Sequence, residues 1–183
     1  MSSKVSGSRL AHCLRVERTA QEMAARFGAE PELVTPAALL HDLCREYDPD
    51  LLLKLAGNFG IVIDDIEKTE PLLLHGAVAA ALARSELGIA NPQVLEAIAY
   101  HITGGPKLSP LAKLVYVADF IEPGRSNCAA RDLRKEAPSM ETGLLLLKVY
   151  NRTHEYLIKN NYLIHPRGIA GRNELIMKGI TEK

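Results

Sequence analysis

The sequence predicts an all-α protein, a single-domain helical bundle, and three observations support this fold class. Apolar residues recur at the three- and four-residue spacing of amphipathic helices, whereas the alternation of β-branched residues that is typical of strands is nearly absent. Pairs such as Asn91-Pro92 and Ser109-Pro110 are typical helix starts, and glycines such as Gly28 and Gly88 are typical helix ends. No linker or repeat divides the chain, so we expect one domain over residues 1–183.

The first half of the chain contains four predicted helices and one irregular segment. Ser8 is predicted to cap a helix that ends at Gly28, because a serine oxygen accepts hydrogen bonds from the free amides of a first turn and glycine adopts the left-handed conformation. Pro31 opens the second helix, which carries the run Leu39-Leu40-His41-Asp42. The apolar segment 57–63 is too short to distinguish a strand from a buried turn, and we expect a loop. The helices of this half are expected over residues 9–27, 31–47, 49–56 and 71–87.

The second half is predicted to hold four more helices. Asn91 and Ser109 are the predicted caps of the first two, and each is followed by a proline at the first helical position. A charged piece over residues 129–136 leads to a long helix that contains four consecutive leucines at 144–147. The helices are expected over residues 92–102, 110–121 and 140–159, followed by a last helix that contains Arg172 and Asn173.

The composition excludes several classes of partner. The 22 lysines and arginines balance the 22 aspartates and glutamates, so no global charge attracts a nucleic acid polymer or an acidic membrane surface. The three cysteines form no Cys-x-x-Cys pair, which is typical of a reducing compartment. The first eight residues hold no apolar run, and no later segment has the length of a membrane span. These observations predict a cytoplasmic, soluble protein.

The pair His41-Asp42 lies at the end of an apolar helical stripe. Helical steps back from His41 reach Ala37 and Leu33, so the imidazole is expected to face the core. An ionised carboxylate drawn toward a core is costly unless a positive group answers it, and a bound metal cation would do so. The alternative for such a pair taken alone is a histidine bonded to a backbone carbonyl beside a surface aspartate.

Other helices repeat this pattern. The candidate residues each lie at or beside the apolar stripe of a predicted helix, and they are His12, His41, Asp42, His75, His101 and Asp119. Asp119 is flanked by Val117-Ala118 and Phe120-Ile121, so we expect it to be buried and to need a cation, supplied by histidines or a metal. Imidazoles with carboxylates suit iron, manganese, zinc or nickel better than calcium or magnesium. His154 is expected to be solvated, and His165 is a loop residue whose role stays open.

The order of these residues, a histidine, then His-Asp, then two histidines and a late aspartate, resembles that of the HD-domain metallohydrolases. The surrounding residues narrow the resemblance to the YqeK family, whose members split diadenosine tetraphosphate symmetrically into two ADP. The resemblance runs from Arg9 to the Arg172-Asn173 pair, and its most specific part is the run from Ala118 to Arg125, ADFIEPGR. The other matching segments are RLAH at 9–12, LLHD at 39–42, PLLLHG at 71–76 and AIAYHITG at 97–104.

The resemblance implies a site and its ligands. It makes His12, His41, Asp42 and Asp119 the ligands of iron, with one or two ions and with manganese or another divalent transition metal as alternatives. It makes Asp42, His75 and His101 the catalytic residues. It also implies an HD-domain core over residues 8–160, with the segment 161–183 packed near a site for a dinucleoside polyphosphate or an ADP-like nucleotide. The substrate-binding residues that it implies are Arg9, Asp42, His75, His101, Ile102, Thr103, Asp119, Arg125, Ile164, His165, Pro166 and Arg167.

Two departures and two alternatives accompany the resemblance. Arg45 stands where HD enzymes commonly have lysine, which keeps the charge but not a proton donor, and Ile102 replaces a threonine of the family's His-Thr-Thr-Gly run. The alternatives are another HD-domain nucleotide phosphohydrolase and a catalytically inactive nucleotide-binding regulatory module. The sequence leaves open a homodimer, the identity and number of metal ions and the choice of purine.

Overall fold

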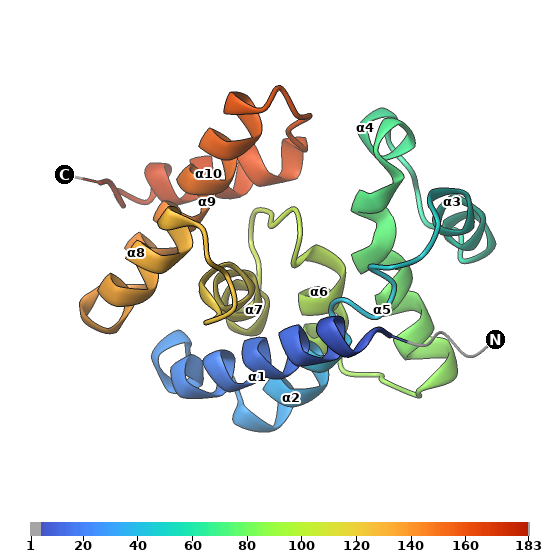
Figure 1. Cartoon of the computed structure of the whole chain (residues 1–183), viewed down its shortest axis with the longest axis horizontal. Coiled ribbons are helices and arrows are strands. Elements are labelled where there is room, and N and C mark those ends of the chain that lie inside the picture. The colour runs from blue at the N-terminus through green and yellow to red at the C-terminus, as the bar shows by residue number, and fades with distance from the viewer. Residues whose placement is uncertain (1–4, 183) are drawn as a thin grey trace.

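The computed structural model describes residues 5–182, and these fold into ten α-helices and two short 3-10 helices without a β-strand. The predicted all-α fold class is confirmed. Figure 1 shows the helices arranged around α7 and α6. In chain order the elements are α1 (Gly7–Phe27), α2 (Pro31–Leu40), α3 (Pro49–Asn58), α4 (Asp65–Thr69), η1 (Pro71–Leu74), α5 (His75–Glu86), α6 (Pro92–Tyr100), α7 (Pro110–Ile121), α8 (Cys128–Glu136), η2 (Ala137–Ser139), α9 (Thr142–Lys159) and α10 (Pro166–Met177).

Most predicted caps are confirmed, and one is wrong. Asn91 and Ser109 cap α6 and α7 by accepting hydrogen bonds from amides of the first turn, and Gly28 ends α1 with a φ of 69°. The cap of α1 is Ser6 rather than Ser8, because Ser6 has extended backbone and its Oγ accepts from the amide of Arg9 at 3.2 Å. The helix therefore begins two residues earlier than its sequence pattern predicts.

The second helix is shorter than predicted. It ends at Leu40, and His41 and Asp42 lie in hydrogen-bonded turns, in which the amide of Arg45 donates to the carbonyl of Asp42. Two helices were not predicted from the sequence. The charged piece 129–136 belongs to α8, and α4 begins after the expected loop, where Asp64 and Glu67 form a reciprocal capping box.

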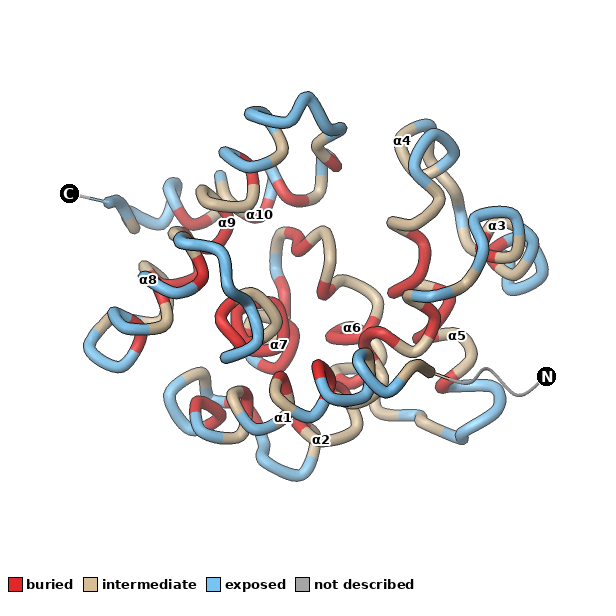
Figure 2. Tube along the Cα trace, viewed as in Figure 1, coloured by how far each residue is buried: buried red, intermediate tan, exposed pale blue. Residues whose placement is uncertain are grey.

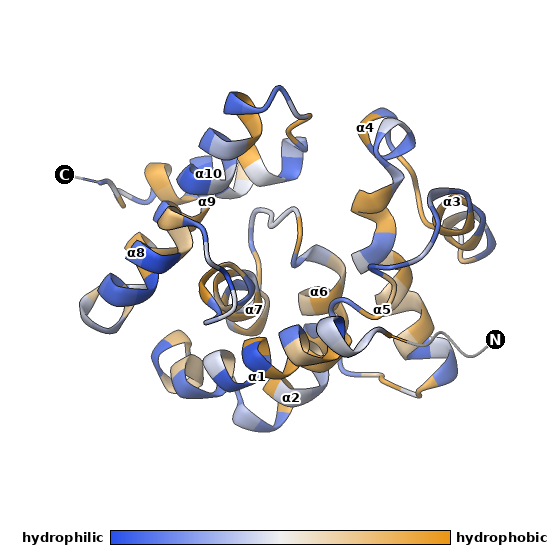
Figure 3. Ribbon diagram, in the orientation of Figure 1, coloured by the Kyte–Doolittle hydropathy of each residue, from blue (hydrophilic) through white to orange (hydrophobic). Residues whose placement is uncertain are grey.

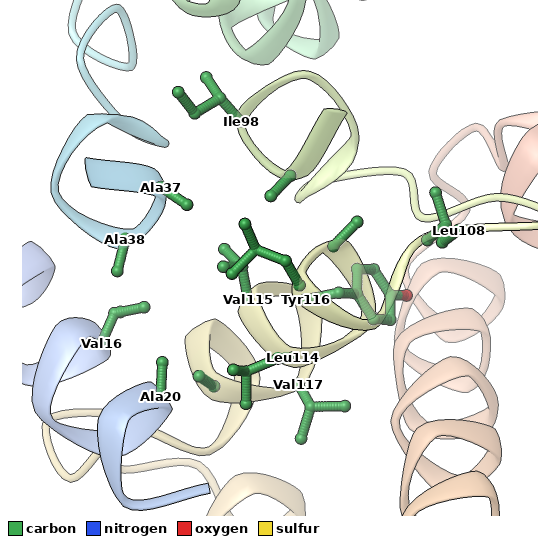
Figure 4. Packing of buried hydrophobic residues seen from close by; sticks show 14 of the residues in the cluster. Val16, Ala20, Ala37, Ala38, Ile98, Leu108, Leu114, Val115, Tyr116 and Val117 are labelled. Atoms are coloured by element: carbon green, nitrogen blue, oxygen red, sulfur yellow. The ribbon is translucent and has the colours of Figure 1, made fainter. Parts of the chain in front are cut away.

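The core is centred on α7. Figure 2 shows buried residues gathered there, and Figure 3 shows hydrophobic residues around α7 and hydrophilic ones along α8. Small side chains let the neighbouring helices approach closely: Figure 4 shows Ala20 of α1 and Ala37 and Ala38 of α2 near Val115 of α7. Each of these four residues is fully buried. Full burial of a side chain the size of valine contributes roughly 1.5–3 kcal/mol, so this packing fixes α1, α2 and α7 relative to one another.

The packing of helices brings the ends of several elements to one place. Helix α1 packs on α2 and α7, α6 packs on α5 and α7, and α2 contacts α6. Gly76 permits the close approach of α5 to α6, since a Cβ there would lie 2.8 Å from the backbone oxygens of Ile98 and Ala99. Among the described residues no helix has the length and apolar character needed to cross a membrane.

Candidate metal centre

The candidate residues from separate helices converge, as the sequence predicts. His12 comes from α1, His75 begins α5 and Asp119 comes from α7, while His41 and His101 directly follow α2 and α6. The imidazole centroid of His41 lies 5.4 Å from that of His12 and 4.7 Å from that of His101. Each of the four histidines of this cluster is buried, and so is Asp42. The predicted convergence on one interior site is confirmed.

One half of the cluster consists of His12, His41, Asp42 and Asp119. Nε2 of His12 lies 3.1 Å from Oδ1 of Asp119, and the Nε2 atoms of His12 and His41 each lie 3.6 Å from Oδ2 of Asp42. Both Nε2 atoms are buried and have no hydrogen-bond partner. Nδ1 of His41 donates to the carbonyl of Ala38 at 2.7 Å, so its Nε2 presents a lone pair to the carboxylates.

The donor set of this half fits a metal ion. His12, His41 and Asp42 offer three ligand atoms within 4.8 Å of one another. Buried lone pairs that face carboxylate oxygens repel one another unless a proton or a cation lies between them. Imidazole nitrogens with carboxylates are donors that suit divalent transition metals. The cluster is therefore able to hold such an ion.

The other half of the cluster consists of Asp42, His75 and His101. Oδ1 of Asp42 lies 3.1 Å from Nε2 of His75 and 3.4 Å from Nε2 of His101. The two Nε2 atoms are 3.0 Å apart, and both Nδ1 atoms are bonded to backbone carbonyls, those of Leu72 and Ile98. These three residues form a second group able to hold a cation. Asp42 thus has one oxygen in each half of the site.

The charges of the cluster are set by its burial and by its ion pairs. Burial lowers the pKa of His41 to about 4, so this imidazole is neutral at pH 7. Burial acts to raise the pKa of Asp42, but the adjacent imidazoles of His101, His75 and His41 outweigh it and hold that pKa well below the usual range. Burial also acts to raise the pKa of Asp119, but the adjacent His12 and Arg125 outweigh it and hold that pKa well below the usual range. Both carboxylates are therefore ionised, as metal ligands must be.

Two arginines flank the carboxylates. Nη1 of Arg9 lies 2.5 Å from Oδ2 of Asp42, and Nη2 of Arg125 lies 2.6 Å from Oδ1 of Asp119. The expectation that only histidines or a metal would supply the positive charge beside Asp119 is wrong, because the turn after α7 brings Arg125 into an ion pair with it. The side chain of Asp119 is also 18% exposed rather than fully buried. The side chains of Arg9 and Arg125 are 26% and 42% exposed, and a guanidinium is a group that binds phosphate.

The predicted nucleotide-binding residues 164–167 lie near the loop that follows α6, and they do not contact the histidine cluster. Ile102 and Thr103 directly follow His101, and the carbonyl of Thr103 would lie 2.9 Å from a Cβ at Gly168 on α10. The guanidinium of Arg167 lies 3.7 Å over the ring of Tyr100. Ile164 and Pro166 flank His165, and none of the three has a described contact with the histidine cluster.

His165 has a defined structural role. Its Nδ1 accepts from the amide of Arg167 at 3.1 Å, so His165 caps α10. Its Nε2 lies 3.2 Å from Oδ2 of Asp64 and 3.8 Å from Oε1 of Glu67, and this contact joins the starts of α4 and α10. A neutral ring whose Nδ1 accepts a hydrogen bond carries its proton on Nε2, so Nε2 of His165 faces these carboxylates as a proton-bearing group.

His154 is buried, and its predicted solvation is wrong. Its side chain packs beside Tyr150, with ring centroids 6.0 Å apart, because α10 covers this face of α9. Its Nδ1 has no hydrogen-bond partner. His154 also lines a cavity of about 390 Å³ between α9 and α10, with Asn151 and Arg172 among the other lining residues.

Sequence reasoning assigned no role to Glu122. Its residue is only 1% exposed, and its Oε1 lies 3.2 Å from Nδ1 of His12. Burial acts to raise the pKa of Glu122, but hydrogen bonds from Arg15 and from the amide of Gly124 outweigh it and lower that pKa. The sequence held a signal for the burial of Glu122. Asp119 directly precedes the apolar pair Phe120-Ile121, and Glu122 directly follows the same pair.

Known proteins resemble this chain over most of its length. The family model of the HD domain matches residues 9–124. A protein of Halalkalibacterium halodurans named bis(5'-nucleosyl)-tetraphosphatase, symmetrical, is 32% identical over 170 residues, which cover 93% of this chain and 90% of that protein. A protein of Bacillus subtilis with the same name is 30% identical over 176 residues, covering 96% of this chain and 94% of that protein. A crystal structure from Clostridium acetobutylicum, described as a predicted HD superfamily hydrolase involved in NAD metabolism, has a TM-score of 0.90 and 32% identity, covering 95% of this chain and 92% of that chain.

Proposed function

The chain belongs to the HD-domain family and, within it, to the YqeK-type symmetrical tetraphosphatases, and we propose that it is a metal-dependent hydrolase that splits diadenosine tetraphosphate into two ADP. The relatives that carry this name align with 93% and 96% of the chain. The observation that carries the reaction class is the placement of Asp42, whose two oxygens face imidazole nitrogens in both halves of the cluster.

We propose that His12, His41, Asp42 and Asp119 hold the metal, because their donor atoms converge around two unpartnered Nε2 atoms. Iron is the proposed metal, with manganese or another divalent transition metal as the alternative, and His75 with His101 supplies donors for a second ion. A bound divalent metal lowers the pKa of water and withdraws electron density from a phosphoryl group, which is the chemistry that an anhydride hydrolase needs at neutral pH.

The protein's own groups then complete the reaction. Asp42 is placed to accept a hydrogen bond from the attacking water and to orient it. Water oxygen bonds to the second phosphorus of the tetraphosphate, the bond from that phosphorus to the central bridging oxygen breaks, and the leaving ADP carries the bridging oxygen away. The imidazoles of His75 and His101 face this side of Asp42 and are the groups placed to pass a proton to the leaving phosphate.

Arginines supply the positive charge that the polyphosphate requires. Arg9 and Arg125 each contact a carboxylate of the cluster with part of the guanidinium, and the remaining donors are available to phosphoryl oxygens. Ile102, Thr103 and the segment 164–167 are the proposed contacts for the nucleoside, since they lie together beside the loop that follows α6. Arg167, stacked on Tyr100, fixes one edge of this region.

Product chromatography tests the proposed function. The iron-loaded protein incubated with diadenosine tetraphosphate in oxygen-18 water is expected to yield ADP alone, with the label in one of every two ADP molecules. The Asp42→Asn variant, which keeps the side-chain shape, serves as the matched control and is expected to be inactive. AMP with ATP as products would contradict symmetrical cleavage, and tight nucleotide binding without any product would favour a regulatory module instead.

A further inference from the structure

His12 is the one histidine of the cluster that lacks a backbone partner for its Nδ1. His41, His75 and His101 each bond Nδ1 to the carbonyl oxygen three residues earlier, at 2.7, 2.5 and 2.9 Å. His41 and His101 cap the C-terminal ends of α2 and α6, and His75 caps the end of η1. A carbonyl oxygen has two lone pairs, and those in the last turn of a helix keep spare acceptor capacity, so each of these three rings finds an acceptor in its own backbone.

The position of His12 explains why it needs another acceptor. It lies inside the first half of α1, which runs from Gly7 to Phe27, where backbone carbonyls are already bonded along the helix. An acceptor for its Nδ1 therefore has to come from a different element. Glu122, directly after α7, supplies it through Oε1 at 3.2 Å.

Glu122 is held in place by groups that do not touch the cluster. Its Oε2 accepts from Nε of Arg15 at 2.6 Å and from the amide of Gly124 at 2.5 Å. Arg15 lies one turn beyond His12 on α1 and keeps its side chain 39% exposed. These two donors occupy Oε2, while Oε1 faces Nδ1 of His12 as an acceptor and also accepts a longer bond from Nη2 of Arg15 at 3.5 Å.

We propose that Glu122 is a positioning residue for the metal: it keeps the ring proton of His12 on Nδ1, so that the lone pair of Nε2 points between Asp42 and Asp119. This inference rests on the proposed metal site and goes beyond it, because it assigns the orientation and tautomer of the His12 ring to a residue outside the ligand set. The negative charge of Glu122 also strengthens the imidazole as a donor, as carboxylates behind metal-binding histidines do. Glu122 touches no reacting atom.

Metal affinity of the Glu122→Gln variant tests the charge of this residue. Competition with a chromophoric chelator gives the Kd for Fe²⁺ of the full chain under anaerobic conditions, and we expect it to weaken about 10- to 100-fold. The matched control is Glu96→Gln, which changes a part-buried carboxylate that accepts from the amide of Ser109 outside the cluster. We expect the control to bind Fe²⁺ as the unaltered protein does, and a Kd for Glu122→Gln within twofold of that value would overturn the proposal.

A second measurement on the unaltered chain does not depend on a variant that folds. Nitrogen-15 spectra of the zinc-loaded protein, with diamagnetic Zn²⁺ as the probe, are expected to place the His12 proton on Nδ1 and the metal on Nε2. The reverse assignment would overturn the role of Glu122. Failure of the unaltered protein to bind either Fe²⁺ or Zn²⁺ would instead contradict the proposed function, so the two failures are distinguishable.

Discussion

The Nε2 atoms of His75 and His101 face each other across 3.0 Å, although both rings bond their Nδ1 atoms to backbone carbonyls. With both protons used at Nδ1, each Nε2 presents a lone pair to the other ring and to Oδ1 of Asp42. Three acceptors without a donor require a proton, a cation or a phosphate hydroxyl between them. This half of the cluster is therefore built to receive a positive or proton-bearing group.

The first prediction follows from this arrangement. The His101→Asn variant removes the Nε2 lone pair from the site while the proposed metal ligands stay in place. We expect kcat for diadenosine tetraphosphate to fall about 100-fold or more, as for loss of an acid-base group, with the ion at His12, His41 and Asp119 retained. Steady-state kinetics and metal analysis of the same sample check this. A kcat within threefold of the unaltered protein would remove His101 from the mechanism.

The second prediction concerns the packing that brings His75 to His101. A Cβ at Gly76 would lie 2.8 Å from backbone oxygens of α6, so Gly76→Ala has to push α5 away from α6. Overpacking of this kind costs about 1–3 kcal/mol of unfolding free energy. We expect a lower Tm together with a loss of kcat, because the same shift separates the two imidazoles.

A glycine in open space is the control for Gly76. A Cβ at Gly57 in α3 meets nothing within 4 Å. Gly57→Ala is therefore expected to leave activity unchanged and to stabilise the protein by up to about 1 kcal/mol, since alanine favours the helix more than glycine does. Equal effects of the two substitutions on kcat would contradict the packing argument.

The third prediction concerns Arg125, which bonds the Asp119 carboxylate through Nη2 and the Asp119 carbonyl through Nε. Lysine keeps the charge but has no planar fork, so it cannot hold this geometry and also reach a phosphate. Arg125→Lys is expected to raise KM about tenfold, the equivalent of one charge-assisted hydrogen bond. Arg131→Lys, at an exposed residue of α8, is the matched control. A KM equal to that of the control would exclude Arg125 from substrate binding.

The fourth prediction concerns His154, whose buried Nδ1 has no partner. Burial, and then the nearby Arg172, lower its pKa below 6.5, so the unfolded chain binds the proton more readily than the folded one. The contribution of His154 to the free energy of unfolding therefore decreases as the pH falls below about 6.5. His154→Leu removes the unsatisfied group and is expected to unfold at equal or higher denaturant concentration at pH 7, with a smaller loss on acidification.

His165→Leu is the contrasting variant for His154. It removes the cap of α10 and the contact with Asp64, so it is expected to destabilise the protein by about 1 kcal/mol or more. Denaturant unfolding of both variants at two pH values gives the comparison. If His154→Leu destabilised the protein as much as His165→Leu does, the claim that the imidazole of His154 is buried without a stabilising partner would be contradicted.

The features that could be predicted from the sequence are those set by local pattern. The caps Asn91 and Ser109 were predictable because a side-chain acceptor followed by proline acts within one turn. The convergence of the candidate histidines was predictable because each lies on an apolar stripe, and apolar stripes face a shared core. The resemblance to a family added the substrate and the metal, which residue patterns alone do not supply.

The features that could not be predicted depend on contacts between distant segments. His154 has polar sequence neighbours, and its burial arises only because α10 covers α9. Arg125 pairs with Asp119 because the chain turns back after α7. His165 contacts Asp64 although about a hundred residues separate them in the sequence. The homodimer, the cytoplasmic location and the identity of the metal stay predictions.

The position of the metal tests the central claim most directly. In crystals of the iron-loaded protein, an anomalous difference map at the iron edge locates the ion independently of any activity. We expect a peak at roughly 2.0–2.3 Å from Nε2 of His12, Nε2 of His41 and a carboxylate oxygen each of Asp42 and Asp119. A peak bound elsewhere, or a water-filled cluster in protein that contains stoichiometric iron, would contradict the account.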